Sequence, residues 1–524
     1  MRLFAALLPL LASLAPAAGA EPQALVVLSV AGGSDISGGL DALGATIETA
    51  GLAQSVGAEL ARWTKIDSLD GLDPTRRCGA ALMVDGPLIA PLAILPIRDI
   101  DALLVSLAPV LGEVERQPDG SIKIGQGQWT GYLAVRDGWA FLAQTPDDLR
   151  ELPNAASLLA PPRAGADAAL ALYPQRLPEA YRTMALDYLG AELRARGVND
   201  LEREPRDDDW ETETLRVVER SLADAEEVHW SWTLDAVGGT ASLEIEVVAV
   251  ADSELAGAIA RLEQASAPMP DAADEAVALQ VAGGWAWPEA EHDEDAGLDC
   301  SEKALLDILA LLPRGEGEVG RSARDALTDE LRAKIDEARR QGPVRWSAEI
   351  VGRELPWTLA IGIDLGDEGK ARALGERWKA ATAGEVDATA DAQLTRRLFG
   401  EESKLQSAGV GGRLLLAIGP QAAARLQRRA KAADVAPEER AALHGWLRLG
   451  TLLRAVARWN GDANYAGAVN AMAEQARLGD DRVFVAVAGQ DRRLLARVVL
   501  RDGSLKAAAS QIATAVFLSK VLSP

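Results

Sequence analysis

The hydrophobic positions repeat one order of elements four times along the chain. Each repeat begins with a short apolar run that stops at Gly or Pro, which is typical of a buried strand. A segment with apolar residues three or four apart follows, and then two alternating runs around a Gly turn, which indicate a hairpin. The predicted lead strands cover residues 24–30, 168–173, 276–281 and 413–418.

The other predicted elements follow from the same periodicities. The helical segments cover residues 40–63, 178–225, 301–340 and 421–459. The hairpins pair 79–84 with 88–97, 229–234 with 241–248, 345–350 with 357–363, and 483–487 with 494–500; the first repeat has room for an extra hairpin, 131–134 with 138–143. Each hairpin runs into an acidic residue, and these are predicted helix caps: Asp99, Asp252, Asp367 and Asp502.

This order predicts an α+β fold of four diverged β-α-β-β-α units, with antiparallel sheets covered by helices. With the next lead strand included, each unit matches a ferredoxin-like (split βαβ) connectivity. The predicted boundaries are a signal peptide at 1–20 and units at 21–160, 161–287, 288–412 and 413–524. The uneven spacing of the units argues against a regular solenoid.

The first twenty residues predict export. Arg2 forms a short positive region, Leu3 to Leu14 is apolar, and Ala18 to Ala20 supplies small residues for cleavage. The apolar run is shorter than the roughly 20 residues of a permanent span. We therefore expect a periplasmic or secreted protein that begins near Glu21 and has no membrane span after cleavage.

Composition narrows the set of partners. The chain has 524 residues, 48% of them apolar, so it is long enough for a large core. A formal net charge of −24 repels nucleic acid and anionic membrane surfaces, and we expect neither as a partner. Cys78 and Cys300 are the only cysteines, so the chain is not a disulfide scaffold; one bridge and two buried thiols both remain open.

Residue types that carry catalysis are few. The three histidines, His229, His292 and His444, have no zinc-site spacing, and no serine-nucleophile motif is present. Gly32 and Gly33 follow a strand without the Lys-Ser/Thr end of a phosphate loop. The acidic segment 288–299 lacks the EF-hand pattern and is interpreted as a solvated linker. We expect no cofactor and no metal.

Tryptophan is the unusual residue, with 13 against 5 Phe and 5 Tyr. Trp230 and Trp232 share one face of a predicted strand, and so do Trp285 and Trp287. Rings on a sheet either fill the core or, when exposed, stack on sugars or line an apolar chamber. These four tryptophans are the candidate ligand-binding residues.

Three short motifs in the first unit add a resemblance. They are Gly71-Leu-Asp-Pro74, Pro96-Ile-Arg-Asp99 at a strand-to-helix step, and Asp137-Gly-Trp-Ala-Phe141. Together with the signal peptide, they make the chain similar to a family of large exported bacterial proteins of unknown function. The resemblance covers most of residues 21–160 and implies export and alternating hairpins and helices, with no activity or site residues.

The sequence therefore favours a non-catalytic extracytoplasmic scaffold or binding protein. Its expected partner is an extracytoplasmic protein, a glycan or an apolar ligand. The alternative is a cell-envelope hydrolase that uses paired carboxylates, which 78 acidic residues leave open. A buried carboxyl with a raised pKa would favour the hydrolase, and a Trp-lined apolar surface would favour the binding protein.

Overall fold

The computed structural model describes residues 23–47, 51–64, 68–85, 88–126, 129–179, 181–184, 223–265, 276–285, 329–331, 333–335, 337, 342–381, 397–400, 404–431, 441–459 and 463–511. The chain divides into two compact units, one of residues 1–250 with 508–524 and one of residues 251–507.

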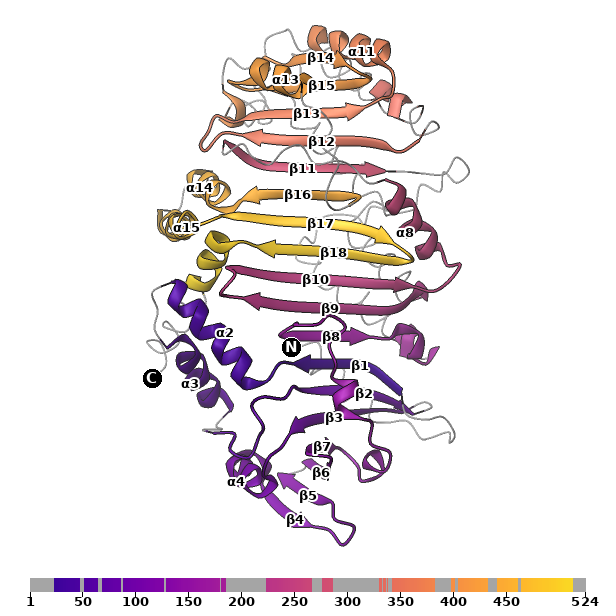
Figure 1. Cartoon of the computed structure of the whole chain (residues 1–524), viewed down its shortest axis with the longest axis vertical. Helices are drawn as coiled ribbons and strands as arrows, with labels where there is room; N and C mark the ends of the chain where they lie inside the picture. Colours follow the sequence, from indigo (N-terminus) through magenta and orange to yellow (C-terminus); the bar gives the residue numbers. More distant parts are fainter. Residues whose placement is uncertain are drawn as a thin grey trace, which may run out of the picture. The chain divides into compact units, whose positions relative to one another are not determined.

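The first unit is built on an antiparallel sheet (Figure 1). Its strands are β1 (Gln23–Val30), β2 (Cys78–Asp85), β3 (Leu88–Pro96), β4 (Glu113–Arg116), β5 (Ile122–Gln126), β6 (Trp129–Arg136), β7 (Trp139–Ala143), β8 (Ala168–Leu172), β9 (Ala225–Asp235) and β10 (Thr240–Ala249). They pair in the order β4-β5-β6-β7-β3-β2-β1-β8-β9-β10.

Short helices cover parts of both faces of this sheet. They are α2 (Gly33–Thr46), α3 (Leu52–Thr64), α4 (Ile100–Leu111), the 3-10 turns Asp147–Leu149 and Pro174–Arg176, and α5 (Ala155–Leu158). Leu149 and Leu159 pack with Phe141 and Ala171 on one face. On the other face, the leucines of α4 pack against β5 to β7.

The strands of the second unit are also paired antiparallel. They are β11 (Val277–Trp285), β12 (Val344–Val351), β13 (Thr358–Asp364), β14 (Gln406–Val410), β15 (Arg413–Ile418), β16 (Leu443–Arg448), β17 (Arg482–Gln490) and β18 (Arg493–Leu500). They pair in the order β14-β15-β13-β12-β11-β16-β17-β18.

The helices of the second unit pack on both faces. They are α8 (Glu254–Gln264), α11 (Glu368–Ala381), α13 (Ala422–Lys431), α14 (Leu449–Trp459) and α15 (Ala463–Ala476), and residues 502–507 are also helical. The largest core cluster places Trp378 of α11 and Phe399 against Trp346 and Ile361 of the sheet. On the opposite face, Leu426 of α13 packs against Leu415. No helix in the described ranges is both long enough and apolar enough to cross a membrane.

The α+β class and the antiparallel pairing are confirmed, and so are the predicted hairpins, including the extra one formed by β6 and β7. Asp99 and Asp367 cap α4 and α11 as predicted, by accepting hydrogen bonds from backbone N–H groups of the first turn. Asp252 does not cap α8. The cap is Ser253, whose hydroxyl accepts from the Ala256 amide, while Asp252 has a positive φ of 61°.

Two predictions about elements are wrong. The helix predicted over residues 421–459 contains strand β16, which pairs with β11 and takes the place expected for the strand at 413–418. A Cβ at Gly445 would lie 2.5 Å from the carbonyl oxygen of Gln280, so glycine permits this close pairing. The helix predicted over residues 40–63 is two helices separated near Gly51, whose φ is +69°.

The predicted split βαβ connectivity also needs correction. Both β1 and β11 pair with the first strand of the following hairpin, β2 or β12, whereas a split βαβ would place them beside the second. In the first unit, helices α2 and α3 lie between β1 and β2 in the chain. The chain enters β2 running opposite to β1, so the two strands pair antiparallel. In the second unit, α11 follows β13, and β15 lies between β13 and β14, so these two strands have the split arrangement.

Candidate functional site

Two neighbouring rows of apolar side chains cross strands β1, β8, β9 and β10 of the first unit. Residues that pair directly across strands lie on the same face of a sheet. The first row runs from Leu28 through Leu170 and Trp230 to Ile245. The second row runs from Val30 through Ala168 and Trp232 to Leu243. We call these eight residues the tryptophan face; Figure 1 shows the four strands side by side.

The tryptophan face is accessible to solvent. Leu28 is 44% exposed, Trp232 41% and Leu243 36%, and Trp230 is half-buried. The eight side chains include no charged group and no hydroxyl. Exposed apolar side chains that adjoin one another, unlike single scattered ones, indicate a place where another molecule is bound.

Neighbouring residues define where the exposed tryptophan face ends. Towards the start of β1, the next two residues of the same face, Val26 and Leu172, pack in one apolar cluster with Tyr181 and Met184. On the opposite face of the same strands, Val27 and Ala171 pack into the apolar core of the first unit, while β9 and β10 present polar residues such as Ser231 and Glu244. There Ser29 donates to the carbonyl of Leu159 and accepts from Arg77. The hairpin β9–β10 thus has a polar side, where Glu244 forms an ion pair with Arg163, and an apolar side that remains partly open.

Of the four candidate tryptophans, the structure brings Trp230 and Trp232 together on one face, as predicted. Trp285 ends β11 in the second unit, so its backbone is distant in the chain from that pair, and its side chain and all of Trp287 lie outside the described residues. The signal peptide, the acidic segment 288–299 and Cys300 also lie outside them. Cys78 is a free, half-buried thiol, and burial raises its pKa.

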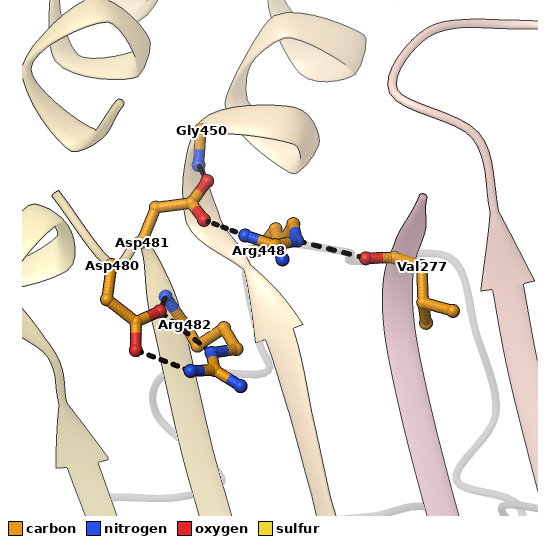
Figure 2. Close-up of polar contacts among 6 residues, drawn as sticks. All are labelled: Val277, Arg448, Gly450, Asp480, Asp481 and Arg482. Carbon is orange, nitrogen blue, oxygen red and sulfur yellow. Dashed lines mark hydrogen bonds and ion pairs between the residues drawn. The ribbon is translucent and has the colours of Figure 1, made fainter. Parts of the chain in front are cut away.

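A connected polar cluster lies in the second unit, where β16 meets α14 (Figure 2). Arg448 pairs with Asp481 at 3.0 Å and donates from Nε to the carbonyl of Val277 at 3.1 Å. The other oxygen of Asp481 accepts from the amide of Gly450 at 3.2 Å, in the first turn of α14. The Asp481 side chain is 8% exposed. This carboxylate therefore both neutralises Arg448 and stabilises a helix N-terminus.

Asp480 points away from Asp481 and binds Arg482 through two hydrogen bonds, of 2.8 and 2.7 Å (Figure 2). Burial opposes the ionisation of Asp480, but the hydrogen bonds and charge of Arg482 outweigh it and hold the pKa below 3.8. The Arg482 guanidinium lies 5.9 Å from the Trp446 ring and 5.3 Å from the Phe484 ring. A cation and an aromatic ring thus lie two residues apart along both β16 and β17, with Trp446 paired to Phe484 and Arg448 to Arg482.

These carboxylates do not have the properties of a glycosidase pair. A general acid needs a raised pKa. Hydrogen bonds lower the pKa of Asp73, Asp119, Glu337 and Glu354, as Arg482 does for Asp480. The pKa of each of these five carboxyls is therefore shifted away from the value that the hydrolase hypothesis requires.

Sequence reasoning missed the buried polar residues of the second sheet. Arg429 of α13 reaches down to Glu349 of β12, with Nε 3.3 Å from the carboxylate, and both side chains are buried. His444 is buried on β16, and burial lowers its pKa. In the sequence, such a residue is visible only as a charged or polar position within an apolar strand pattern. That pattern indicates burial but does not identify the side chain with which the residue pairs.

The comparisons with known proteins add no assignment. No family model matches the chain, and neither a curated protein nor a solved structure matches it.

Proposed function

We propose that this protein is a non-catalytic extracytoplasmic binding protein, and that its tryptophan face takes an apolar ligand. The observation that carries the proposal is the pair of apolar rows in which Leu28, Trp232 and Leu243 remain exposed. Burial of such surface is favourable by roughly 25 cal/mol per Å². Adjoining apolar side chains that stay exposed to water therefore support binding of another molecule at this surface.

An apolar ligand fits this face better than a glycan does. Sugars stack on aromatic rings, but they also need side chains that hydrogen-bond to their hydroxyls. The eight side chains of the tryptophan face offer only the indole N–H groups of Trp230 and Trp232. We therefore assign a neutral, largely aliphatic or aromatic ligand to this site.

The two units of the chain can be compared strand by strand. The strand order β3-β2-β1-β8-β9-β10 of the first unit corresponds to β13-β12-β11-β16-β17-β18 of the second. We infer that β16, and not β15, leads the fourth repeat. The row that corresponds to Leu28, Leu170, Trp230 and Ile245 then consists of Val281, Gly445, Val485 and Val498. The row that corresponds to Val30, Ala168, Trp232 and Leu243 consists of Gly283, Leu443, Val487 and Ala496. Neither of these two rows has an aromatic ring, so the tryptophans at these positions are specific to the first unit.

Titration of the purified protein with the neutral fluorescent probe N-phenyl-1-naphthylamine tests the proposal. We expect binding that weakens about tenfold or more in Trp232→Ala, and further in the double variant with Trp230→Ala, because large aromatic contacts dominate binding surfaces. Val485→Ala is the matched control, since Val485 is 38% exposed at the corresponding position of the second unit. Unchanged affinity in the double variant, with circular dichroism showing a folded chain, would contradict the assignment.

A further inference from the structure

The apolar rows of the tryptophan face continue beyond β1 onto strand β2. Ala80 pairs directly with Leu28 and extends the first row, and Cys78 pairs with Val30 and extends the second. Residues that pair directly across strands share one face of the sheet. Ala80 is exposed, and Cys78 is a half-buried free thiol. We call the eight residues of the tryptophan face, together with Ala80 and Cys78, the apolar strip.

Neighbouring segments cover the sheet on both sides of the apolar strip. On one side, Val26 and Leu172 pack in a cluster with Tyr181. On the other side, Leu234 lies against helix α2, where a Cβ at Gly39 would be 3.6 Å from the Cδ2 atom of Leu234. The part of the face that stays accessible is therefore the pair of rows between these two segments.

The apolar strip is much longer than it is wide. It crosses the neighbouring strands β2, β1, β8, β9 and β10, and four interstrand steps of about 4.8 Å give a length of roughly 19 Å. Its two rows lie about 7 Å apart, because residues i and i+2 of a strand are separated by two rises of about 3.4 Å. Beyond β2 the first row continues through Ala93 to Leu142, which packs with the leucines of α4, so the strip ends there.

We propose that the ligand of the apolar strip is a long unbranched aliphatic chain that lies across the strands from β10 to β2. The inference rests on the proposed function of the tryptophan face and names the shape of its ligand. A length of roughly 19 Å corresponds to an extended chain of about 16 carbons, given the strand spacing. The strip has no charged side chain that such a chain would cover and leave unpaired. A compact ring system placed on Trp230 and Trp232 leaves Leu28 and Ala80 in water.

Displacement of N-phenyl-1-naphthylamine from the purified full chain by neutral 1-alkanols, from hexanol to tetradecanol, tests the proposal. Each methylene group that leaves water favours binding, so we expect the affinity to rise about threefold or more for each added pair of carbons through to tetradecanol. A site that holds only a compact ligand predicts that the rise ends near octanol.

Ala80→Asp places a carboxylate at the β2 end of the strip, three interstrand steps or about 14 Å from Trp230. Covering an unpaired charge with an aliphatic chain is unfavourable, so we expect the affinity for tetradecanol to fall about fivefold or more and the affinity for hexanol to stay the same. Val105→Asp is the matched control, because Val105 is 75% exposed on α4, outside the strip. This control should leave the affinity for every alkanol unchanged.

Alkylation of Cys78 in the unchanged protein gives a second measurement that needs no variant to fold. A chain that reaches β2 covers the thiol, so tetradecanol should slow its reaction with iodoacetamide about fivefold or more, whereas hexanol should not. Peptide mass spectrometry follows the modification at Cys78 itself.

Three results would each overturn the long-chain inference: equal affinities for octanol and tetradecanol, an Ala80→Asp effect on hexanol as large as that on tetradecanol, and an unchanged alkylation rate of Cys78 with tetradecanol bound. The proposed function fails on a different result, namely probe binding that does not depend on Trp230 and Trp232. Probe binding that weakens in Trp232→Ala, without any dependence on alkanol length, keeps the tryptophan face as a binding site and rejects the long chain alone.

Discussion

Replacement of Asp481 by alanine is expected to destabilise the second unit more than any surface ion-pair variant does. The Asp481 carboxylate holds two partners at once, the Arg448 guanidinium at 3.0 Å and the Gly450 amide at 3.2 Å. Its side chain is almost fully buried, while that of Arg448 is 22% exposed. The variant therefore leaves a positive charge in a largely buried place and an unpaired N–H at the start of α14.

The magnitude follows from these two losses. Removal of one partner of a buried ion pair costs about 3–5 kcal/mol, and the low end applies because Arg448 keeps its hydrogen bond to Val277 and some contact with solvent. Loss of the acceptor at the helix N-terminus adds about 1 kcal/mol. We expect a decrease of about 4 kcal/mol in the free energy of unfolding for Asp481→Ala. Asp481→Asn keeps an acceptor for Gly450 and should lose about 3 kcal/mol.

Urea unfolding followed by circular dichroism measures the change, with separate fits where the two units unfold in separate transitions. Hydrogen exchange at residues 449–452 reports the helix start directly. Glu368→Ala is the control, because Glu368 and Arg372 form an exposed pair whose loss costs at most about 1 kcal/mol. If Asp481→Ala and Glu368→Ala unfold at the same urea concentration with equal slopes, the ion pair and the helix-end contact do not stabilise the unit as reasoned.

Three further outcomes are expected. The low pKa of Asp480 stabilises the fold above about pH 4, and this contribution is lost as the pH falls through the folded pKa, so Asp480→Asn should flatten the decline of urea midpoints below about pH 4. Burial lowers the pKa of His444 below 6.5, so the unfolded chain binds a proton at a higher pH than the folded chain does. The free energy of unfolding should therefore fall as the pH drops below about 6.5, and it should fall less steeply in His444→Gln. Gly445→Ala should lower the melting temperature strongly, because its Cβ would meet the Gln280 carbonyl at 2.5 Å, whereas Gly57→Ala, with nothing within 4 Å, should not.

The sequence by itself determined the class and most of the local elements. Period-two alternation around glycine turns located the hairpins, because direction and burial alternate along a strand whatever its partner is. Asp99 was recognisable as a helix cap because a cap interacts only with the next turn. The shared face of Trp230 and Trp232 also followed from their spacing of two residues.

Only the tertiary structure decided which elements pair and which polar groups meet. Strand β16 resembled a helix in sequence, because its short run Leu443–Arg448 lies between amphipathic helices and its partner β11 is far away in the chain. The same holds for the tryptophan face, where Leu28 and Trp230 meet only through β8. Ion pairs such as Arg448 with Asp481 join residues 33 positions apart. Periodicity records how one segment is buried, whereas pairing depends on the whole sheet, and a sequence of 54 basic and 78 acidic side chains does not specify which of them lie within hydrogen-bond distance.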